Sequence, residues 1–165
     1  MRSVIFQKLR CFIKHDKGAA LAELAILVPF LILLVAAVAE FGRFFQKYTT
    51  LSKATRTATR YLSNHPFPDS QDEAANLVVC GKLTCAGGDE LVPGLSTANV
   101  CIQSTLTVGG GKIETVTVSI PRTGGGGCGA PLNYQPIFNI GALLNTGFTF
   151  TPAIAPSTTM YYVVE

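Results

Sequence analysis

The chain has no tryptophan, two histidines and few charged residues, which make up 14% of its 165 positions. Such a composition offers no strongly basic surface, so we predict no nucleic-acid partner. His15 lies near the N-terminus and His65 precedes a proline, and no nucleophile motif accompanies either residue. The sequence therefore supports no hydrolase constellation, and we expect a protein that is not an enzyme and uses no cofactor.

Charge is scarcest between Ala19 and Ala39, where Glu23 is the only charged residue. A helix rises about 1.5 Å per residue, so this stretch spans roughly the 30 Å of a bilayer's hydrocarbon core. Residues 19–39 are therefore predicted to form a transmembrane helix in contact with membrane lipid. Pro29 lies inside it and is expected to kink the helix rather than to end it, since neighbouring helices compensate for such a break.

Basic residues are concentrated before the apolar segment. Residues 1–18 contain five lysines or arginines and one acid, whereas the remainder contains eight against nine. A basic flank favours the cytoplasmic side, so we expect residues 1–18 to be a cytoplasmic leader and the C-terminal part to lie outside the inner membrane. Five basic residues just beyond the apolar segment, from Arg43 to Arg60, weaken this asymmetry.

Cysteine is sparse before the apolar segment, where Cys11 is alone, and the other four all follow it: Cys80, Cys85, Cys101 and Cys128. Four cysteines facing an oxidising space predict two disulfides, with all three pairings left open. Free buried thiols are an alternative. Zinc is disfavoured because four residues separate Cys80 from Cys85 and no second close pair follows, so we predict no metal site.

Residues 40–64 continue the helix as an amphipathic segment. Its apolar residues recur at spacings of three and four, and they are Phe41, Phe44, Phe45, Tyr48, Leu51, Ala54, Ala58, Tyr61 and Leu62. We expect one helix from about Lys17 to Asn64, ended by Pro66 and Pro68. The aromatic residues at 41 to 48, like Pro29, are assigned to helix packing, either against the chain's own sheet or between subunits.

Residues 65–165 are predicted to form a small periplasmic or extracellular α+β domain. The acidic run from Asp69 opens a short helix that Gly81 closes. The period then changes to two, which predicts strands at 100–108 and 113–120, joined as a hairpin across the glycines at 109–111. Further strands are expected at 148–151 and 160–164. This antiparallel sheet needs a cover, and the aromatic face of the long helix is the nearest candidate.

The junction between leader and helix resembles the processing site of type IV pilin-like proteins. It is most similar to TadE-like pseudopilins of the tight-adherence (Tad) pilus system, through Lys17-Gly18-Ala19-Ala20, Glu23-Leu24-Ala25 and Pro29-Phe30. The later Glu40-Phe41-Gly42-Arg43 run and the Thr-Arg-Tyr-Leu-Ser segment at 59–63 add to the likeness, which covers about the first 65 residues. Leu24 departs from the aromatic residue often seen after the glutamate.

The resemblance implies a pilin-like fold in which a prepilin peptidase cuts after Gly18 and leaves Ala19 as the new N-terminus. Its implied partners are other pilin subunits, the peptidase and an inner-membrane assembly platform. Glu23, about 6 Å into the helix, is costly in hydrocarbon unless paired or neutralised. It would pair with the free amine of a neighbouring subunit and set the register of assembly. Alternatively, Glu23 lies at the membrane surface, stabilised by the helix N-terminus and Lys17.

These features predict a minor pilin or pseudopilin that primes or supports a Tad-type adhesive pilus. The main alternative is a monomeric envelope-binding domain with no filament role, either anchored or secreted. Ala37-Val38-Ala39 before Glu40 matches the small-x-small pattern of a secretory signal, which would remove residues 1–39. The long region before the apolar run and the amphipathic continuation of the helix argue against that cleavage.

Overall fold

The computed structural model describes residues 16–106, 112–124, 128–138 and 151–163. Its elements are two α-helices, α2 (Asp16–Ser63) and α3 (Gln71–Cys80), a 3-10 turn η1 (Thr97–Asn99), and three strands, β1 (Cys101–Leu106), β2 (Ile113–Ser119) and β3 (Ser157–Tyr161). A long N-terminal helix with a small antiparallel sheet confirms the predicted α+β fold. The chain divides into two compact units, residues 1–41 and 42–165.

Helix α2 contains 48 residues, with Pro29 inside it, and its ends lie one residue from those predicted. No break occurs at the change from apolar to amphipathic sequence, because the apolar spacing of three and four continues through it. At its C-terminal end, the side-chain amide of Asn64 donates to the carbonyl of Arg60 over 2.9 Å. This bond satisfies one of the carbonyls that a helix end leaves without an internal partner.

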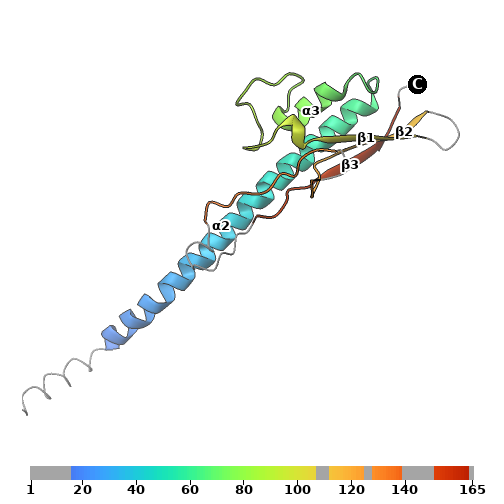
Figure 1. Cartoon of the computed structure of the whole chain (residues 1–165). Helices are drawn as coiled ribbons and strands as arrows, with labels where there is room; N and C mark the ends of the chain where they lie inside the picture. The colour runs from blue at the N-terminus through green and yellow to red at the C-terminus, as the bar shows by residue number, and fades with distance from the viewer. Residues whose placement is uncertain (1–15, 107–111, 125–127, 139–150, 164–165) are drawn as a thin grey trace, which may run out of the picture. The chain divides into compact units, whose positions relative to one another are not determined.

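Within the second unit, α3 and the three strands lie along the part of α2 that follows Gly42 (Figure 1). The short helix α3 confirms the predicted helix after the prolines. Gly81 ends it with a φ of 71°, and its N–H donates to the Leu77 carbonyl over 3.1 Å. A residue with a side chain is strained at such a φ, which explains why the helix ends at a glycine.

The sheet has the order β1-β2-β3, and both pairs of strands are antiparallel. Val116 and Val118 of β2 are fully buried, while the residues between them face the other way. On that outer face the hydroxyls of Thr117 and Thr159 lie 2.8 Å apart. The sheet therefore has one apolar face toward the core and one hydroxyl-rich face toward solvent, as period-two patterning requires.

One apolar core joins all parts of the second unit. Its members come from both helices, the sheet and the extended segments around them: Leu51, Ala58, Leu62, Ala74, Val78, Val79, Val92, Leu95, Val116, Val118, Ile120, Leu132, Tyr134 and Ile154. The second half of α2 is thus a component of this core and covers the sheet.

The face of α2 that we expected to cover the sheet contributes Leu51, Ala58 and Leu62 to the core, and threonines beside that face make the hydrogen bonds to β3. The hydroxyls of Thr55 and Thr158 lie 3.3 Å apart, and Thr59 Oγ1 donates to the Thr158 carbonyl over 3.4 Å. Phe41 and Phe45 are 62% and 58% exposed. Among the aromatic residues of this face, Phe44 and Tyr61 pack against the core, so only part of the face has the expected role.

Two disulfides are present, as the cysteine count predicted, and they join Cys80 to Cys85 and Cys101 to Cys128. The first closes a loop directly after α3, with Cα atoms 6.0 Å apart. The second joins the start of β1 to a residue 27 positions later, with Cα atoms 5.1 Å apart. Because a longer loop loses more freedom when closed, the second bond constrains the unfolded chain more.

Several expected features lie outside the described residues. These are most of the leader, the hairpin glycines at 109–111 and most of the strand expected at 148–151. The C-terminal strand is present but starts earlier than predicted, at Ser157 instead of Met160. Its first three residues, Ser157, Thr158 and Thr159, are all polar, including Thr158, which faces α2, so they lacked the apolar pattern of a strand.

Candidate membrane and assembly interface

The first half of α2 exposes apolar side chains on all sides. Every residue from Gly18 to Ala39 is exposed except Ala36, which is half-buried. Ile26 is 77% exposed and Phe30 66%. Removing apolar surface from water lowers the free energy by about 25 cal/mol per Å². An exposed apolar surface of this extent therefore favours surroundings other than water. In the described part of the chain, one helix is long and apolar enough to cross a membrane.

Glu23 is the only charged residue on this apolar half, and its side chain is exposed. No described side chain lies within ion-pair distance of it. A carboxylate in hydrocarbon costs several kcal/mol unless it is neutralised or paired. In a membrane, Glu23 therefore needs a partner from outside the described residues of its own chain, or a position near the lipid headgroups.

Gly18 and Ala19 lie in the first turn of α2, and both are exposed. A Cβ atom added at Gly18 would meet nothing within 4 Å. The described packing of the chain thus gives no reason for a glycine at this position. A recognition event outside the folded chain, such as cleavage, would provide one.

The four aromatic residues assigned to helix packing fall into two groups. Phe44 packs against the core, where its ring lies edge-on to that of Tyr134, with centroids 5.5 Å apart. Phe41, Phe45 and Tyr48 are 62%, 58% and 39% exposed. Their spacing of four and three residues puts them on one face of α2. Phe44 therefore packs against the core of its own chain, whereas the other three residues form an exposed aromatic stripe.

Glu40 is a residue whose burial the sequence did not indicate. It is 7% exposed, and among the described residues it is the only buried acidic or basic residue. The pattern showed Glu40 as the first charge after the apolar segment, a position that suits an exposed residue as well as a buried one. Its place beside Phe41 and Gly42 in the family motif was the signal that it is more than a solvated charge.

The histidine considered for catalysis has a structural position. The ring of His65 stacks on Tyr61, with centroids 3.9 Å apart, and its Nδ1 lies 2.8 Å from the Tyr61 carbonyl oxygen. Over residues 16–106, 112–124, 128–138 and 151–163, no three His, Cys, Asp or Glu side chains are grouped as metal ligands would be. His65 thus helps to form the turn that follows α2.

Among the described residues, one apolar helix that could span a membrane and a small α+β unit define a class of protein with a candidate membrane segment and a folded C-terminal unit. Residues 18–60 match the family model of TadE-like proteins, which confirms the resemblance found at the leader junction. This family is associated with Tad pili and is structural, not enzymatic. No curated protein and no solved structure matches the chain.

Proposed function

We propose that this chain is a minor pilin or pseudopilin that primes or supports assembly of a Tad-type adhesive pilus. The observation that supports the proposal is the overlap between the family match and the exposed apolar part of α2. The TadE-like match covers residues 18–60, and the same stretch includes the entire exposed apolar half of α2. Helices of this kind associate in lipid through close packing of their surfaces, so the apolar half of α2 would supply both the anchor and the assembly surface.

In this proposal, residues 1–18 are a cytoplasmic leader, residues 19–39 cross the inner membrane, and the domain from residue 65 is displayed outside it on the amphipathic stretch 40–64. A prepilin peptidase removes the leader after Gly18. The new amine of Ala19 then pairs with Glu23 of a neighbouring subunit. Other pilin-type subunits and an inner-membrane assembly platform are the partners.

The role of Glu23 is tested by comparing Glu23→Ala and Glu23→Gln with Asp72→Ala, which removes an exposed carboxylate from α3. We expect both Glu23 variants to insert in the membrane as the wild type does and to lose assembly, measured by co-purification with pilus subunits and by counting surface fibres. Asp72→Ala should assemble normally. Normal assembly of Glu23→Ala would refute the register role and favour an anchored domain with no filament function.

Cleavage is tested separately by determining the first residue of the chain purified from membranes. Ala19 as the first residue supports prepilin processing. Glu40 instead would show removal of a secretory signal, and Met1 would show an uncleaved anchor. Either of these two results would refute the pilin proposal at its first step, independently of the Glu23 experiment.

A further inference from the structure

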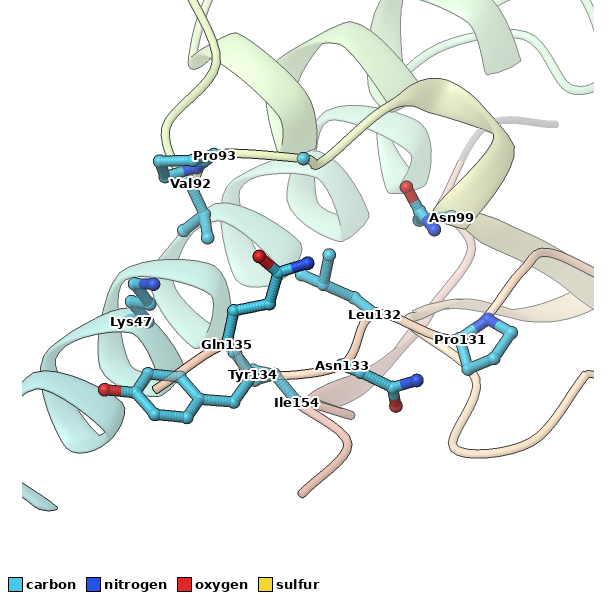
Figure 2. A pocket seen from close by; sticks show the side chains of 11 residues that line it. Lys47, Val92, Pro93, Asn99, Pro131, Leu132, Asn133, Tyr134, Gln135 and Ile154 are labelled. Atoms are coloured by element: carbon cyan, nitrogen blue, oxygen red, sulfur yellow. The ribbon is translucent and has the colours of Figure 1, made fainter. Parts of the chain in front are cut away.

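The second unit contains a cavity of about 520 Å³ that the proposed assembly role does not use. One helix residue, Lys47, forms part of its wall, together with the loop at 92–94 and the extended segment 131–135 (Figure 2). Ligand sites in proteins typically enclose about 300–1,000 Å³, so the space is large enough for a short piece of another molecule.

The charge of the cavity is positive. Among the described residues that line it, Lys47 is the only cation and none is acidic. The ammonium lies 4.8 Å from the centroid of the Tyr134 ring, which holds it in place without neutralising it. No carboxylate of the described residues lies within ion-pair distance of Lys47. Arg43, one turn earlier on α2, is exposed and adds a second cation on the same side of the helix.

The walls are fixed before any ligand arrives. Asn99 is 8% exposed. Its side-chain oxygen Oδ1 accepts from the Ser96 N–H over 2.9 Å, and its side-chain Nδ2 donates to the Ala130 carbonyl over 3.0 Å. Segments 132–134 and 152–154 are joined by two backbone hydrogen bonds of 2.9 and 2.8 Å. A preformed site loses little freedom on binding, which favours affinity.

At Asn133, which borders the cavity, the backbone N–H and C=O have no hydrogen-bond partner among the described residues. The two backbone bonds flank the antiparallel bridge between Asn133 and Ala153, so the N–H and C=O of Asn133 point away from residues 152–154. An extended peptide can pair with the edge of such a segment through its own backbone. The Gln135 amide, which points into the space between the labelled residues in Figure 2, supplies a further hydrogen-bonding group.

We propose that this cavity binds an extended, acidic peptide segment of another protein, which pairs with the Asn133 edge and places a carboxylate on Lys47. An acidic sugar would share the carboxylate, but sugar sites commonly offer an open aromatic face, and the Tyr134 ring is 1% exposed, with Lys47 over it and Phe44 against it. The apolar walls from Val92, Leu132 and Ile154 suit the methylenes of a peptide side chain better. The inference concerns residues 42–163 alone and does not depend on the pilus role.

The test uses the full chain in detergent micelles and the blocked peptide acetyl-Thr-Val-Glu-Val-Thr-amide, with its Gln analogue as the matched probe. Binding is followed by the backbone amide NMR signals of Asn133 and Gln135. We expect saturable binding of the Glu peptide, and binding about tenfold weaker for the Gln peptide or for Lys47→Gln, because a charge-assisted hydrogen bond is lost. Lys53→Gln, on the same helix but outside this cavity, should bind as the wild type does.

A second probe tests the pairing without changing the protein. The Glu peptide is N-methylated either at positions one, three and five or at positions two and four. Because a strand uses alternate residues to face one edge, one of these peptides should lose binding and the other should keep it. Equal binding of the two, equal binding of the Glu and Gln peptides, or an equal loss in Lys53→Gln would each overturn the proposal. So would tighter binding of a galacturonic acid trisaccharide, or no saturable signal at millimolar peptide.

Discussion

The hydroxyl of Tyr162 joins the end of the chain to the turn after α2. It accepts from the Phe67 N–H over 3.0 Å and donates to the His65 carbonyl over 3.1 Å. Two backbone groups of a half-buried, proline-rich turn thus depend on one side chain near the C-terminus. The neighbouring Tyr161 is 74% exposed and provides a natural control.

Tyr162→Phe should lower the free energy of unfolding by about 1–2 kcal/mol, because it leaves a donor and an acceptor in this turn without their partner. Tyr161→Phe should change it by less than about 0.5 kcal/mol, as surface substitutions usually do. Thermal unfolding of the full chain in detergent, followed by circular dichroism, measures both. Equal stability of the two variants would show that water replaces the hydroxyl without cost.

Gly129 shows how little sequence tells about a single backbone position. Its φ is +65°, and a Cβ there would lie 3.1 Å from two atoms of the Pro121 ring and 3.2 Å from the Asn99 carbonyl oxygen. The sequence presented it as one of many glycines in a loop around Cys128. Neither the left-handed backbone nor the close neighbour at Pro121 has a local signal, since both arise from contacts between distant segments.

Gly129→Ala should therefore destabilise the fold by about 1–3 kcal/mol, through an unfavourable φ together with crowding against the Pro121 ring. Gly87→Ala is the matched substitution, because a Cβ at Gly87 meets nothing within 4 Å and its φ is not in the left-handed region. It should leave stability unchanged or slightly raised. The same thermal unfolding experiment decides, and a Gly129→Ala chain as stable as Gly87→Ala would show that the loop relaxes at no cost.

At the scale of elements, α2 has two halves with different surroundings. Its first half is exposed and apolar, and its second half packs small residues, such as Ala54 and Ala58, into the core. The apolar spacing of three and four over residues 41–62 predicted that the helix continues past its apolar segment, and Pro66 and Pro68 predicted its C-terminal end to within one residue. The same pattern could not tell which apolar residues meet the sheet. The predicted face included Ala58, which is in the core, together with Phe41 and Phe45, which are exposed. Thr59, which bonds to β3, was not part of it.

Ala58→Leu tests this packing. The Ala58 side chain is fully buried in the core, so the three added carbons have no space and should cost about 1–3 kcal/mol of unfolding free energy. Thr57→Leu, one position earlier and exposed, should cost nothing measurable. Denaturant unfolding of the two variants, with equal helix content checked by circular dichroism, gives the comparison. An Ala58→Leu chain as stable as wild type would mean that α2 and the sheet are loosely packed.

At the scale of the whole molecule, the distribution of basic residues and disulfides along the chain indicates an orientation in the membrane. The basic residues gather before the apolar helix, and both disulfides lie beyond it. Disulfides persist in oxidising compartments, while positive flanks stay on the cytoplasmic side. These two observations are independent, and both predict the second unit outside the inner membrane. Sequence alone predicts this orientation, and it also predicted two disulfides, which the structure confirms. It could not give the pairing, which depends on how the β1 strand and the loop around Cys128 meet.

The orientation can be tested with a membrane-impermeant maleimide in spheroplasts of a host that lacks a prepilin peptidase. The wild-type chain keeps its leader there, and Cys11 is its only cysteine outside the two disulfides. Wild-type protein should therefore be labelled only after lysis. Gly87→Cys, which adds an exposed thiol on the second unit, should be labelled in intact spheroplasts. Labelling of the wild type before lysis, together with protection of Gly87→Cys, would show the opposite topology. The second unit would then lie in the cytoplasm, where no fibre forms.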